Sequence, residues 1–391
     1  MHLLLAVLCY TKAHWFDGKS FHERTLCTQN GVFIAGRPRS AQTIDLKGAY
    51  VVPPYAEAHN HNVEESEALP ARLDEYLRNG VFYVQNPNSL PRTTPRDRVN
   101  KPDSIDAVFA MGGFTGTDGH PAGVMKRNID RGNATVADTD GAFYHQVDTR
   151  ADLDRKWPLL LAAKPDFVKT YLLYSEEYAQ RKNDPAMYAW KGLDPALLPE
   201  IVRRAHAAGL RVATHVETAA DFRHAVNAGV DTIAHLPGFR PGTGDRYDAP
   251  RFLITDADAK QAARRGIIVI TTVGGVLELK DKIMRDTVAA NLRTLRRHGV
   301  QLAIGSDAYR KGVLLEVAQL RTLGIFTNAE LLDLWTRATP QAIFPTRKVG
   351  RLAKGCEASF LVLEGDPLAD FDNTARIRMR VKRGVELTPG R

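Results

Sequence analysis

A repeated pattern of helix, glycine and short apolar run constrains the fold of this chain more than any other feature of its sequence. Apolar residues recur at helical spacing from Leu197 to Ala208, and Gly209 then precedes an apolar run that ends at His215. The same order leads through Gly229 to the run that ends at His235. Shorter copies of the pattern carry their glycines at Gly80, Gly266 and Gly299. Helices that alternate with strands in this way are typical of parallel βαβ units, so we predict an α/β fold.

The placement of polar residues distinguishes a closed barrel from an open, doubly wound sheet. In a (β/α)8 barrel every strand delivers its C-terminal end to one mouth, whereas an open sheet would scatter the residues found there. We therefore predict a (β/α)8 TIM-like barrel. Its strands are expected near residues 51–59, 81–86, 105–110, 166–171, 210–215, 230–235, 267–272 and 300–306. The span from Pro53 to Pro345 slightly exceeds the roughly 250 residues usual for such a barrel, which leaves room for active-site loops.

The ends of five predicted strands carry residues that can bind a divalent metal ion. His59 and His61 are two positions apart, so a strand projects both side chains to the same side. The full set in chain order is His59, His61, Lys169, His215, His235 and Asp307. A single histidine in an apolar strand is usually a core residue, but the ordered set indicates one metal site and a metallohydrolase. Imidazole and carboxylate ligands suit zinc, and the same set can hold manganese, iron, cobalt or nickel.

Composition and charge are those of a folded enzyme that acts on a small molecule. Of the 391 residues, 44% are hydrophobic and 25% are charged, so the chain can bury at least one large core. No apolar segment approaches the length needed to cross a bilayer. The formal charge of +8 is dispersed along the chain, unlike the basic stretches of nucleic-acid-binding proteins. We expect no nucleic-acid partner and no membrane span, and a surface that favours anionic substrates.

Both ends of the chain carry strand-like segments that are too short to form a core alone. They appear around residues 13–16 and 32–34, and again at 355–363 and 377–381. We predict that these pieces pair into one small β-sandwich beside the barrel. The expected domains are 1–52 for the N-terminal part of the sandwich, 53–345 for the hydrolase barrel and 346–391 for the C-terminal part of the sandwich.

The cysteines and the start of the chain bear on the cellular compartment. Cys9, Cys27 and Cys356 are odd in number, far apart and outside any metal-type spacing, so we expect buried small hydrophobes or free thiols. The run from Leu3 to Leu8 resembles a very short signal h-region, but no Lys or Arg precedes it and no small-x-small cleavage site follows. Localisation is left open: the sequence as it stands favours the cytoplasm, and a longer N-terminal signal would mean export.

Several motifs of the chain occur together in one known group of enzymes. They are an Asp17-Gly18 turn, the His-x-His strand, the later Lys, His, His and Asp strand ends, and the closing segments 338–342 and 349–355. This linear pattern resembles that of the amidohydrolase superfamily, in its imidazolonepropionase-like and prolidase-like branch. One departure is Glu57, which stands where the family usually has an aspartate before the first histidine. The resemblance implies a metal-dependent hydrolase that cleaves a carbon–nitrogen bond of the amide or peptide type.

The same resemblance implies two divalent metal ions, most commonly zinc. The ligands would be His59, His61 and Asp307 for one ion, and His215 and His235 for the other. Lys169 would be carboxylated by carbon dioxide and would bridge the two ions together with a hydroxide, since burial near cations makes the neutral amine accessible. Asp307 would act as general acid and base, taking the proton of the attacking hydroxide and delivering it to the leaving nitrogen.

Substrate contacts are expected from the loops that follow the strands. The segment 112–121 resembles the Gly-His loop of prolidase-like relatives, which makes His120 the first candidate to hydrogen-bond the substrate or the transition state. Tyr171 is the next candidate, to polarise a carbonyl. Loop ordering for His120 and barrel packing for Tyr171 are the structural alternatives. Arg240 could clamp a carboxylate, and Glu217 is expected to support a neighbouring ligand.

Two alternatives stay open on the sequence alone. A mononuclear deaminase or an imidazolone-type hydrolase of cyclic amides would not require Lys169. An inactive amidohydrolase-like binding scaffold typically loses ligands, and none is lost here. The expected partner is a small-molecule substrate, such as an N-acyl amino acid, an Xaa-Pro dipeptide or a cyclic amide, and a homo-oligomer is compatible with the sequence.

Overall fold

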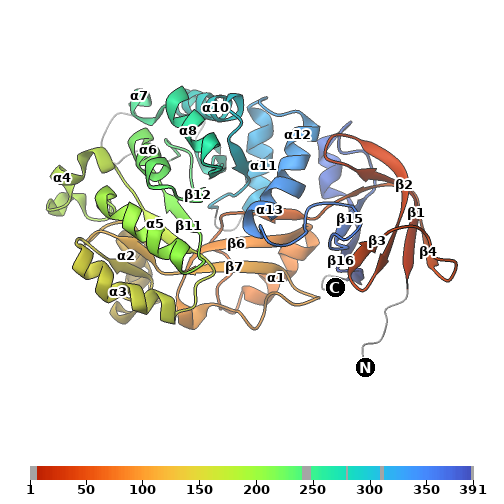
Figure 1. The fold of residues 1–391 in the computed structure, drawn as a ribbon, viewed down its shortest axis with the longest axis horizontal. Coiled ribbons are helices and arrows are strands. Elements are labelled where there is room, and N and C mark those ends of the chain that lie inside the picture. Colours follow the sequence, from red (N-terminus) through yellow and green to blue (C-terminus); the bar gives the residue numbers. More distant parts are fainter. Residues whose placement is uncertain (1–6, 240–247, 279–280, 309–311, 389–391) are drawn as a thin grey trace.

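The computed structural model describes residues 7–239, 248–278, 281–308 and 312–388. Its strands form three sheets, and helices follow one after another along the part of the molecule that holds the parallel strands (Figure 1). Two of the sheets contain parallel strands only, which confirms the predicted α/β class. Over the described ranges, none of the helices is both long and apolar enough to span a membrane.

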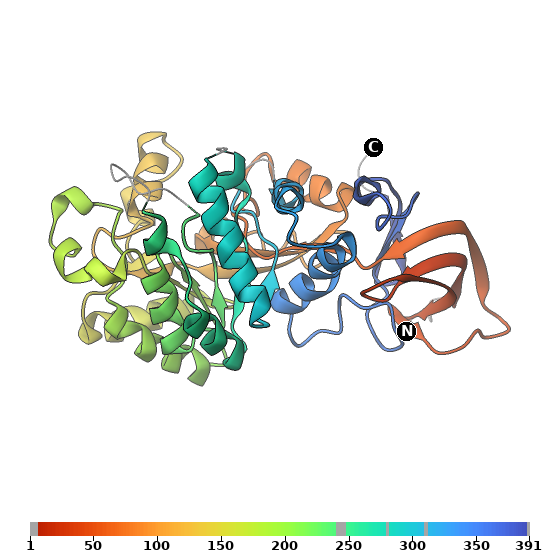
Figure 2. The same ribbon diagram turned by 90° about the horizontal axis from the view of Figure 1, so that it is seen from above.

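The two ends of the chain share one seven-stranded sheet, which lies at one end of the molecule (Figures 1 and 2). Its strands, in spatial order, are β17 (Val385–Leu387), β16 (Ile377–Lys382), β15 (Phe360–Leu363), β4 (Gln42–Val52), β1 (Leu8–Phe16), β2 (Phe21–Gln29) and β3 (Val32–Ile34). The two halves meet where β15 pairs antiparallel with β4. The predicted segments of the two termini therefore lie in one sheet.

Aromatic side chains form the separate core of this terminal sheet. The Phe360 ring meets the rings of Tyr10 and Trp15 edge to face, with centroids 4.8 and 5.5 Å apart. The Trp15 indole donates a hydrogen bond of 2.8 Å to the carbonyl of Arg24, so its polar atom is satisfied while its rings are buried. Because Phe360 comes from the C-terminal half, the two ends of the chain stabilise one another.

The expectation for the cysteines is wrong for two of the three. Cys9 and Cys27 lie directly opposite one another on β1 and β2 and form a disulfide bond, with their Cα atoms 4.0 Å apart. Cys356 is buried and free, as expected. The 18-residue separation in sequence hides this pair because strand register decides which side chains face each other.

The predicted ligand positions lie in the parallel strands or within a few residues of their C-terminal ends. One sheet contains β5 (Tyr55–Glu57), β6 (Val81–Ser89) and β7 (Asp106–Met111). The other contains, in spatial order, β14 (Gln301–Ala303), β13 (Ile268–Ile270), β12 (Thr232–Ile233), β11 (Val212–His215), β10 (Val168–Tyr171), β8 (Gly113–Thr115) and β9 (Tyr144–Gln146). Strands β8 and β9 were not among the predicted strands: β8 lies in the segment 112–121 that was expected to be a loop, and β9 extends the sheet beyond it.

One predicted strand is divided in the structure. The stretch 51–59 was expected to be one strand, but β4 ends at Val52 and β5 begins at Tyr55. Pro53 and Pro54 lie between them and have no backbone N–H to give to a ladder, so the chain passes here from the terminal sheet to the parallel strands. The strand expected at 105–110 is β7; Gly112 follows it, and β8 comes next but pairs in the other parallel sheet.

Backbone hydrogen bonds join the two parallel sheets at both edges. The Ala58 N–H donates to the Ile304 carbonyl over 2.8 Å, which links the ends of β5 and β14. The Asp166 N–H donates to the Phe109 carbonyl over 2.8 Å, which links β7 to the residues just before β10. The first and last parallel strands are therefore neighbours in space.

Helices connect the parallel strands in the order that the sequence predicted. They are α1 (Leu69–Arg78), α2 (Ala122–Asp130), α3 (Arg150–Ala162), α4 (Tyr178–Arg181), α5 (Leu198–Ala207), α6 (Ala219–Ala228), α7 (Ala249–Phe252), α8 (Asp256–Arg264), α9 (Gly274–Glu278), α10 (Lys282–Arg297), α11 (Gly312–Thr322), α12 (Asn328–Asp333) and α13 (Thr339–Ile343), with a π-helical turn at Leu334–Ala338 between the last two. Helix α6 shows the local cause: the Thr218 side chain accepts from the Asp221 N–H at its start. Gly229 ends it at φ +79, a conformation that favours glycine.

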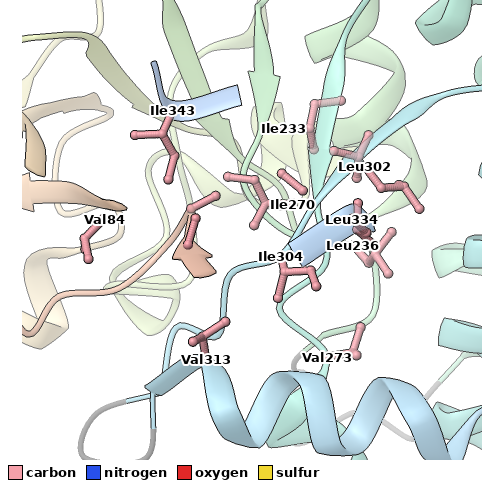
Figure 3. Packing of buried hydrophobic residues seen from close by; sticks show 14 of the residues in the cluster. Val84, Ile233, Leu236, Ile270, Val273, Leu302, Ile304, Val313, Leu334 and Ile343 are labelled. Carbon is pink, nitrogen blue, oxygen red and sulfur yellow. The ribbon is translucent and has the colours of Figure 1, made fainter. Parts of the chain in front are cut away.

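The main core lies between the parallel strands and the helices that cover them. Figure 3 shows side chains of neighbouring strands, such as Ile233, Ile270 and Leu302, packed with Leu334 and Ile343 from the last helical segments. All five are buried, and burying a side chain of this size contributes about 1.5–3 kcal/mol of hydrophobic stabilisation. The strands are thereby fixed relative to one another, and so are their C-terminal ends.

A cluster of charges joins the terminal sheet to the first residue of β7. The buried carboxylate of Asp106 accepts from Lys382 Nζ over 2.8 Å and from Arg383 Nη2 over 2.9 Å. Arg347 lies between Asp106 and Glu357, 2.6 Å from an oxygen of each. Burial lowers the pKa of Lys382 although Asp106 opposes that effect. We refer to these five residues as the Asp106 cluster.

Candidate metal centre

His59 and Asp307, which follow β5 and β14, are held together by the backbone, and His61 lies beside them. The carbonyl of His59 accepts from the N–H of Ser306 over 3.1 Å and from that of Asp307 over 2.9 Å. Asp307 has φ +49, a left-handed conformation that aspartate tolerates better than most residues. Its Oδ1 lies 3.6 Å from Nε2 of His59 and 3.5 Å from Nε2 of His61. The ends of β5 and β14 therefore bring these three predicted ligands to one place.

The other two histidines adjoin this group. The rings of His59 and His235 have centroids 4.5 Å apart, and so do those of His215 and His235. One potential ligand atom from each of His59, His235 and Asp307 lies within 4.8 Å of the other two. Four imidazoles from three separate strand ends thus form a continuous cluster.

Neighbouring side chains orient these imidazoles. His235 Nδ1 lies 2.9 Å from Oγ1 of Thr272, so its Nε2 is the nitrogen left for a metal ion. The Phe239 ring stacks on His235 with centroids 3.9 Å apart. His215 Nε2 lies 3.2 Å from Glu217 Oε1, the type of contact that was expected of Glu217. Contacts of this kind fix the ring orientation of a metal-binding histidine before the ion arrives.

Lys169 lies inside the same wall and is almost fully buried, with 1% of its surface exposed. Its Nζ is 5.3 Å from the centre of the Tyr171 ring. Gly113 on the neighbouring strand makes room for both residues, because a Cβ atom there would lie 2.5 Å from Tyr171 Cε2 and 3.0 Å from Lys169 Cγ. A lysine at this depth needs a specific partner or modification to offset the cost of burial.

The loop candidate His120 reaches the cluster from the start of α2. Its ring centre is 4.8 Å from that of His215 and 5.2 Å from that of Tyr171. The peptide bond between His120 and Pro121 is cis. Arg240, the other loop candidate, lies outside the described residues.

A cavity of about 690 Å³ opens onto all of the predicted site residues. Those in its lining are His59, His61, His120, Lys169, Tyr171, His215, His235 and Asp307. Four imidazoles and a carboxylate, largely buried and close together, form a donor set that fits a borderline divalent ion such as zinc. A divalent ion held by such a set would be able to activate water and to polarise a carbonyl, which is chemistry that a hydrolase needs.

A buried polar network beneath these ligands was not foreseen from the sequence. The Glu57 carboxylate accepts from Asn60 Nδ2 over 2.9 Å, from the Tyr76 hydroxyl over 3.0 Å and from the Ser306 hydroxyl. Asn60 stands between the two histidines of the first strand, and Ser306 directly precedes Asp307. Burial raises the pKa of Glu57 to about 7. The sequence carried a weak signal in Asn60, a polar residue directly between two predicted ligands; it is buried in the structure, so its amide needs partners.

Comparison with known proteins adds the family. A protein-family model described as the amidohydrolase family matches residues 63–387. The chain belongs to this family. Membership confirms the predicted superfamily and the predicted class of enzyme, a hydrolase that acts on carbon–nitrogen bonds. No curated protein matches the sequence of this amidohydrolase.

Solved structures similar to this amidohydrolase agree in fold over nearly the whole chain. Ochratoxinase from A. niger is 17% identical with a TM-score of 0.73, and the match covers 97% of this chain and 95% of that one. A Xaa-Pro dipeptidase with bound methionine is 17% identical with a TM-score of 0.74, covering 98% and 100%. Molinate hydrolase is 16% identical with a TM-score of 0.74, covering 98% and 95%. At these identities the likeness shows the fold.

Proposed function

We propose that this chain is a metal-dependent amide hydrolase with two divalent ions, most commonly zinc. The single observation that carries the proposal is the convergence of four histidines, Lys169 and Asp307 on one cavity. When bound, the ions would supply the means to activate water and to polarise the amide carbonyl. The protein's own contribution is to hold the ions, orient the amide and move protons.

The ligands divide by their position. His59 and His61, together with Asp307, would hold one ion, since the Asp307 carboxylate lies within 3.6 Å of both imidazoles. His215 and His235 would hold the other. Lys169, carboxylated on its amine, would serve both ions; its burial next to the histidine cluster supports this role.

Proton transfer falls to Asp307 in this proposal. A carboxylate beside the attacking water can take its proton and then give it to the leaving nitrogen, which would otherwise depart as an unstable amide anion. His120 and Tyr171 border the same cavity and would donate hydrogen bonds to the oxygen that becomes negative during attack.

We also propose that the parallel strands close into one (β/α)8 barrel over residues 53–345. Support comes from the backbone hydrogen bonds that link β5 to β14 and β7 to the start of β10. The terminal regions, 1–52 and 346–391, would form the smaller β-sandwich domain, a proposal supported by their shared sheet and separate core. A barrel explains the convergence of the ligands because all its strands point their C-terminal ends to one mouth.

The experiment that tests the function is a substrate screen with metal analysis. Metal-free protein is reconstituted with zinc or manganese, its metal content is measured, and it is assayed on dipeptides, N-acyl amino acids, cyclic amides and lactones. We expect two ions per chain and turnover that a chelator abolishes. One tightly held ion with full activity would instead indicate the mononuclear deaminase or cyclic-amide hydrolase, and a metal-loaded protein that cleaves nothing would indicate a binding scaffold.

Lys169 separates the binuclear from the mononuclear scheme. Lys169→Ala should lose one ion and most of its turnover, whereas Lys260→Ala, on the exposed face of α8, should keep both. Isotope-labelled bicarbonate should give a carbamate signal by NMR in the parent protein and none in the Lys169 variant. Normal turnover of Lys169→Ala would reject the two-ion scheme.

A further inference from the structure

Three arginines form part of the cavity wall that the proposed function leaves unused. Arg127 and Arg131 come from α2 and its C-terminal cap, and Arg72 comes from α1. Val124 and Asn128 line the cavity as well. Positions 124, 127, 128 and 131 follow one another at helical spacing, so a single face of α2 borders the cavity.

Helix α2 runs from the histidine cluster along this wall. It begins directly after His120 and Pro121, and the His120 ring lies 4.8 Å from that of His215. Side chains on a helix lean toward its N-terminus, which here is the end nearest the predicted ligands. Arg127 follows this direction, because its Nη1 would lie 3.9 Å from a Cβ atom at Gly123, one turn nearer the N-terminus.

The three guanidinium groups have no acidic partner within the described ranges. No carboxylate of those residues lies within the 4.0 Å of an ion pair from Arg72, Arg127 or Arg131. Lys126, on the opposite face of the same helix, pairs with Asp130 over 2.7 Å. Like charges one turn apart, as at Arg127 and Arg131, slightly destabilise a helix, so this arrangement has a cost that an anion would remove.

The charges of the residues that line the cavity also favour an anionic ligand. Asp307 provides the lone carboxylate among the described lining residues, and the proposed function already uses it. Lys169 and the three arginines are the basic groups of that lining, and divalent ions would add further positive charge. A concave site with walls of one sign concentrates ligands of the opposite sign.

We propose that Arg127, Arg131 and Arg72 form a subsite for a carboxylate carried by the substrate. The inference rests on the proposed function, because it assigns the substrate class of that same site: amides whose far end carries a carboxylate. Guanidinium groups suit this ligand, since their N–H donors match the two carboxylate oxygens in one plane. His120 lies at the other end of this wall, so the amide would lie near the histidines and the carboxylate would lie over α2.

Measurements of ligand affinity test the carboxylate subsite without requiring that the ligand be cleaved. The probes are hippurate, which is an N-acyl amino acid with a free carboxylate, and hippuramide, which is its uncharged counterpart. Both are titrated calorimetrically into the zinc-loaded protein and into the double variant Arg127→Gln with Arg131→Gln. We expect hippurate to bind about tenfold more tightly than hippuramide in the parent protein and equally in the double variant, in keeping with charged hydrogen bonds that are partly exposed.

Lys126→Gln is the matched control, because it removes one positive charge from the same helix but on the face away from the cavity. It should keep the preference for hippurate. Added salt should weaken hippurate binding to the parent protein and leave hippuramide unchanged. Equal affinities of the parent protein for the two probes, or a preference that survives the double substitution, would overturn the subsite.

Turnover then separates this inference from the function on which it rests. With a cleaved N-acyl amino acid and its amide as substrates, the double variant should raise KM about tenfold for the acid, leave KM for the amide unchanged and leave kcat intact for both. A protein that binds hippurate through the arginines but cleaves no amide would contradict the proposed function and keep the subsite. Equal losses on acid and amide would contradict the subsite and keep the function.

Discussion

Two buried polar clusters lie at opposite ends of the parallel strands, and they balance charge in different ways. The Asp106 cluster surrounds the first residue of β7, and its carboxylates meet Lys382 and two arginines of the protein itself. The candidate metal centre follows the last residues of β5 and β11, and Asp307 is the carboxylate there among imidazoles and Lys169. The first cluster is complete within the protein, and the second is composed of ligands that suit external ions.

The difference separates a contribution to stability from a contribution to function. A buried ion pair between protein groups costs much to break, because the remaining charge stays buried without a partner. A cluster of neutral imidazoles gains its full value when a cation binds. Substitutions in the Asp106 cluster should therefore change the free energy of unfolding, and substitutions at the centre should change metal affinity and turnover.

The largest effect is expected at Asp307. Asp307→Asn keeps the size of the side chain but removes its charge and its capacity to take a proton, so kcat should fall by about 10²–10⁴-fold. The measurement is steady-state kinetics at saturating metal. Asp45→Asn, in an exposed pair with Lys12 on the terminal sheet, should leave kcat unchanged. If Asp307→Asn retained more than a tenth of the parental kcat, Asp307 would not be the residue that transfers the proton.

The converse substitution is Asp106→Ala. It leaves the buried Lys382 ammonium without its carboxylate, while Arg347 and Arg383 keep Glu357, so unfolding in urea should show a loss of about 3–5 kcal/mol. Turnover per folded molecule should stay near that of the parent protein. The control is Asp372→Ala, whose exposed pair with Arg321 should contribute no more than about 1 kcal/mol. If Asp106→Ala lost activity but kept its stability, the Asp106 cluster would serve function and not stability, contrary to the comparison made above.

A third prediction concerns Glu316, which is buried near the centre and bonded to backbone N–H groups of Val273 and Gly274. Burial, with a smaller contribution from the nearby Glu57, raises its pKa from 4.5 to about 7 although its hydrogen bonds oppose that shift. Between these two pH values the unfolded chain releases the proton while the folded protein keeps it, so stability falls as pH rises from about 4.5 to 7. The full effect is up to about 3 kcal/mol.

Glu316→Gln cannot titrate at this position and should show a shallower decline over the same pH range. Urea unfolding at several pH values, in the presence of a chelator so that metal binding does not contribute, measures the difference. A pH dependence of the variant as steep as that of the parent protein would show that Glu316 is ionised or exposed in the folded state.

The smallest effect is expected at Ser306, which lies beneath the ligands. Ser306→Ala removes no ligand but disconnects Glu57 and Asn60 from the residue before Asp307. Metal affinity, measured by competition with a chelator, should fall about 10–100-fold. Ser359→Ala removes a buried hydroxyl that bonds Glu357 in the Asp106 cluster, and it should leave metal affinity unchanged. If the two serine substitutions lowered metal affinity equally, the metal centre and the Asp106 cluster would not differ in their effect on metal binding.

The sequence was informative wherever a local rule decides the outcome. The helix, glycine and strand repeat predicted helices α5 and α6 and the strands that follow them, because capping residues and glycine act over a few positions. It was misleading around Val51, where two consecutive prolines transfer the chain between sheets. It also missed the bond between Cys9 and Cys27, since strand register depends on the whole sheet.

The sequence predicted the metal ligands, because they follow one another in order at the ends of predicted strands. It did not predict the polar residues that hold these ligands in place. Asn60 and Tyr76 are ordinary polar residues in sequence, and only packing brings them to Glu57. Arg127 and Arg131 likewise gave no signal in the sequence, and the structure shows that they line the cavity. Their relation to His120 depends on how α2 lies against the strands.

The amino-acid sequence by itself determined the family, the alternation of strands and helices, and the residue types available for a metal ion, because periodicity and motif order are local properties of a chain. Only the tertiary structure decided which side chains lie side by side in the wall of the cavity. Packing between segments up to hundreds of residues apart sets three features of the site. It sets the distances between Asp307 and the histidines, the burial of Lys169 and the side of α2 that borders the cavity. Such contacts depend on the summed burial of many apolar side chains, which no short stretch of sequence contains.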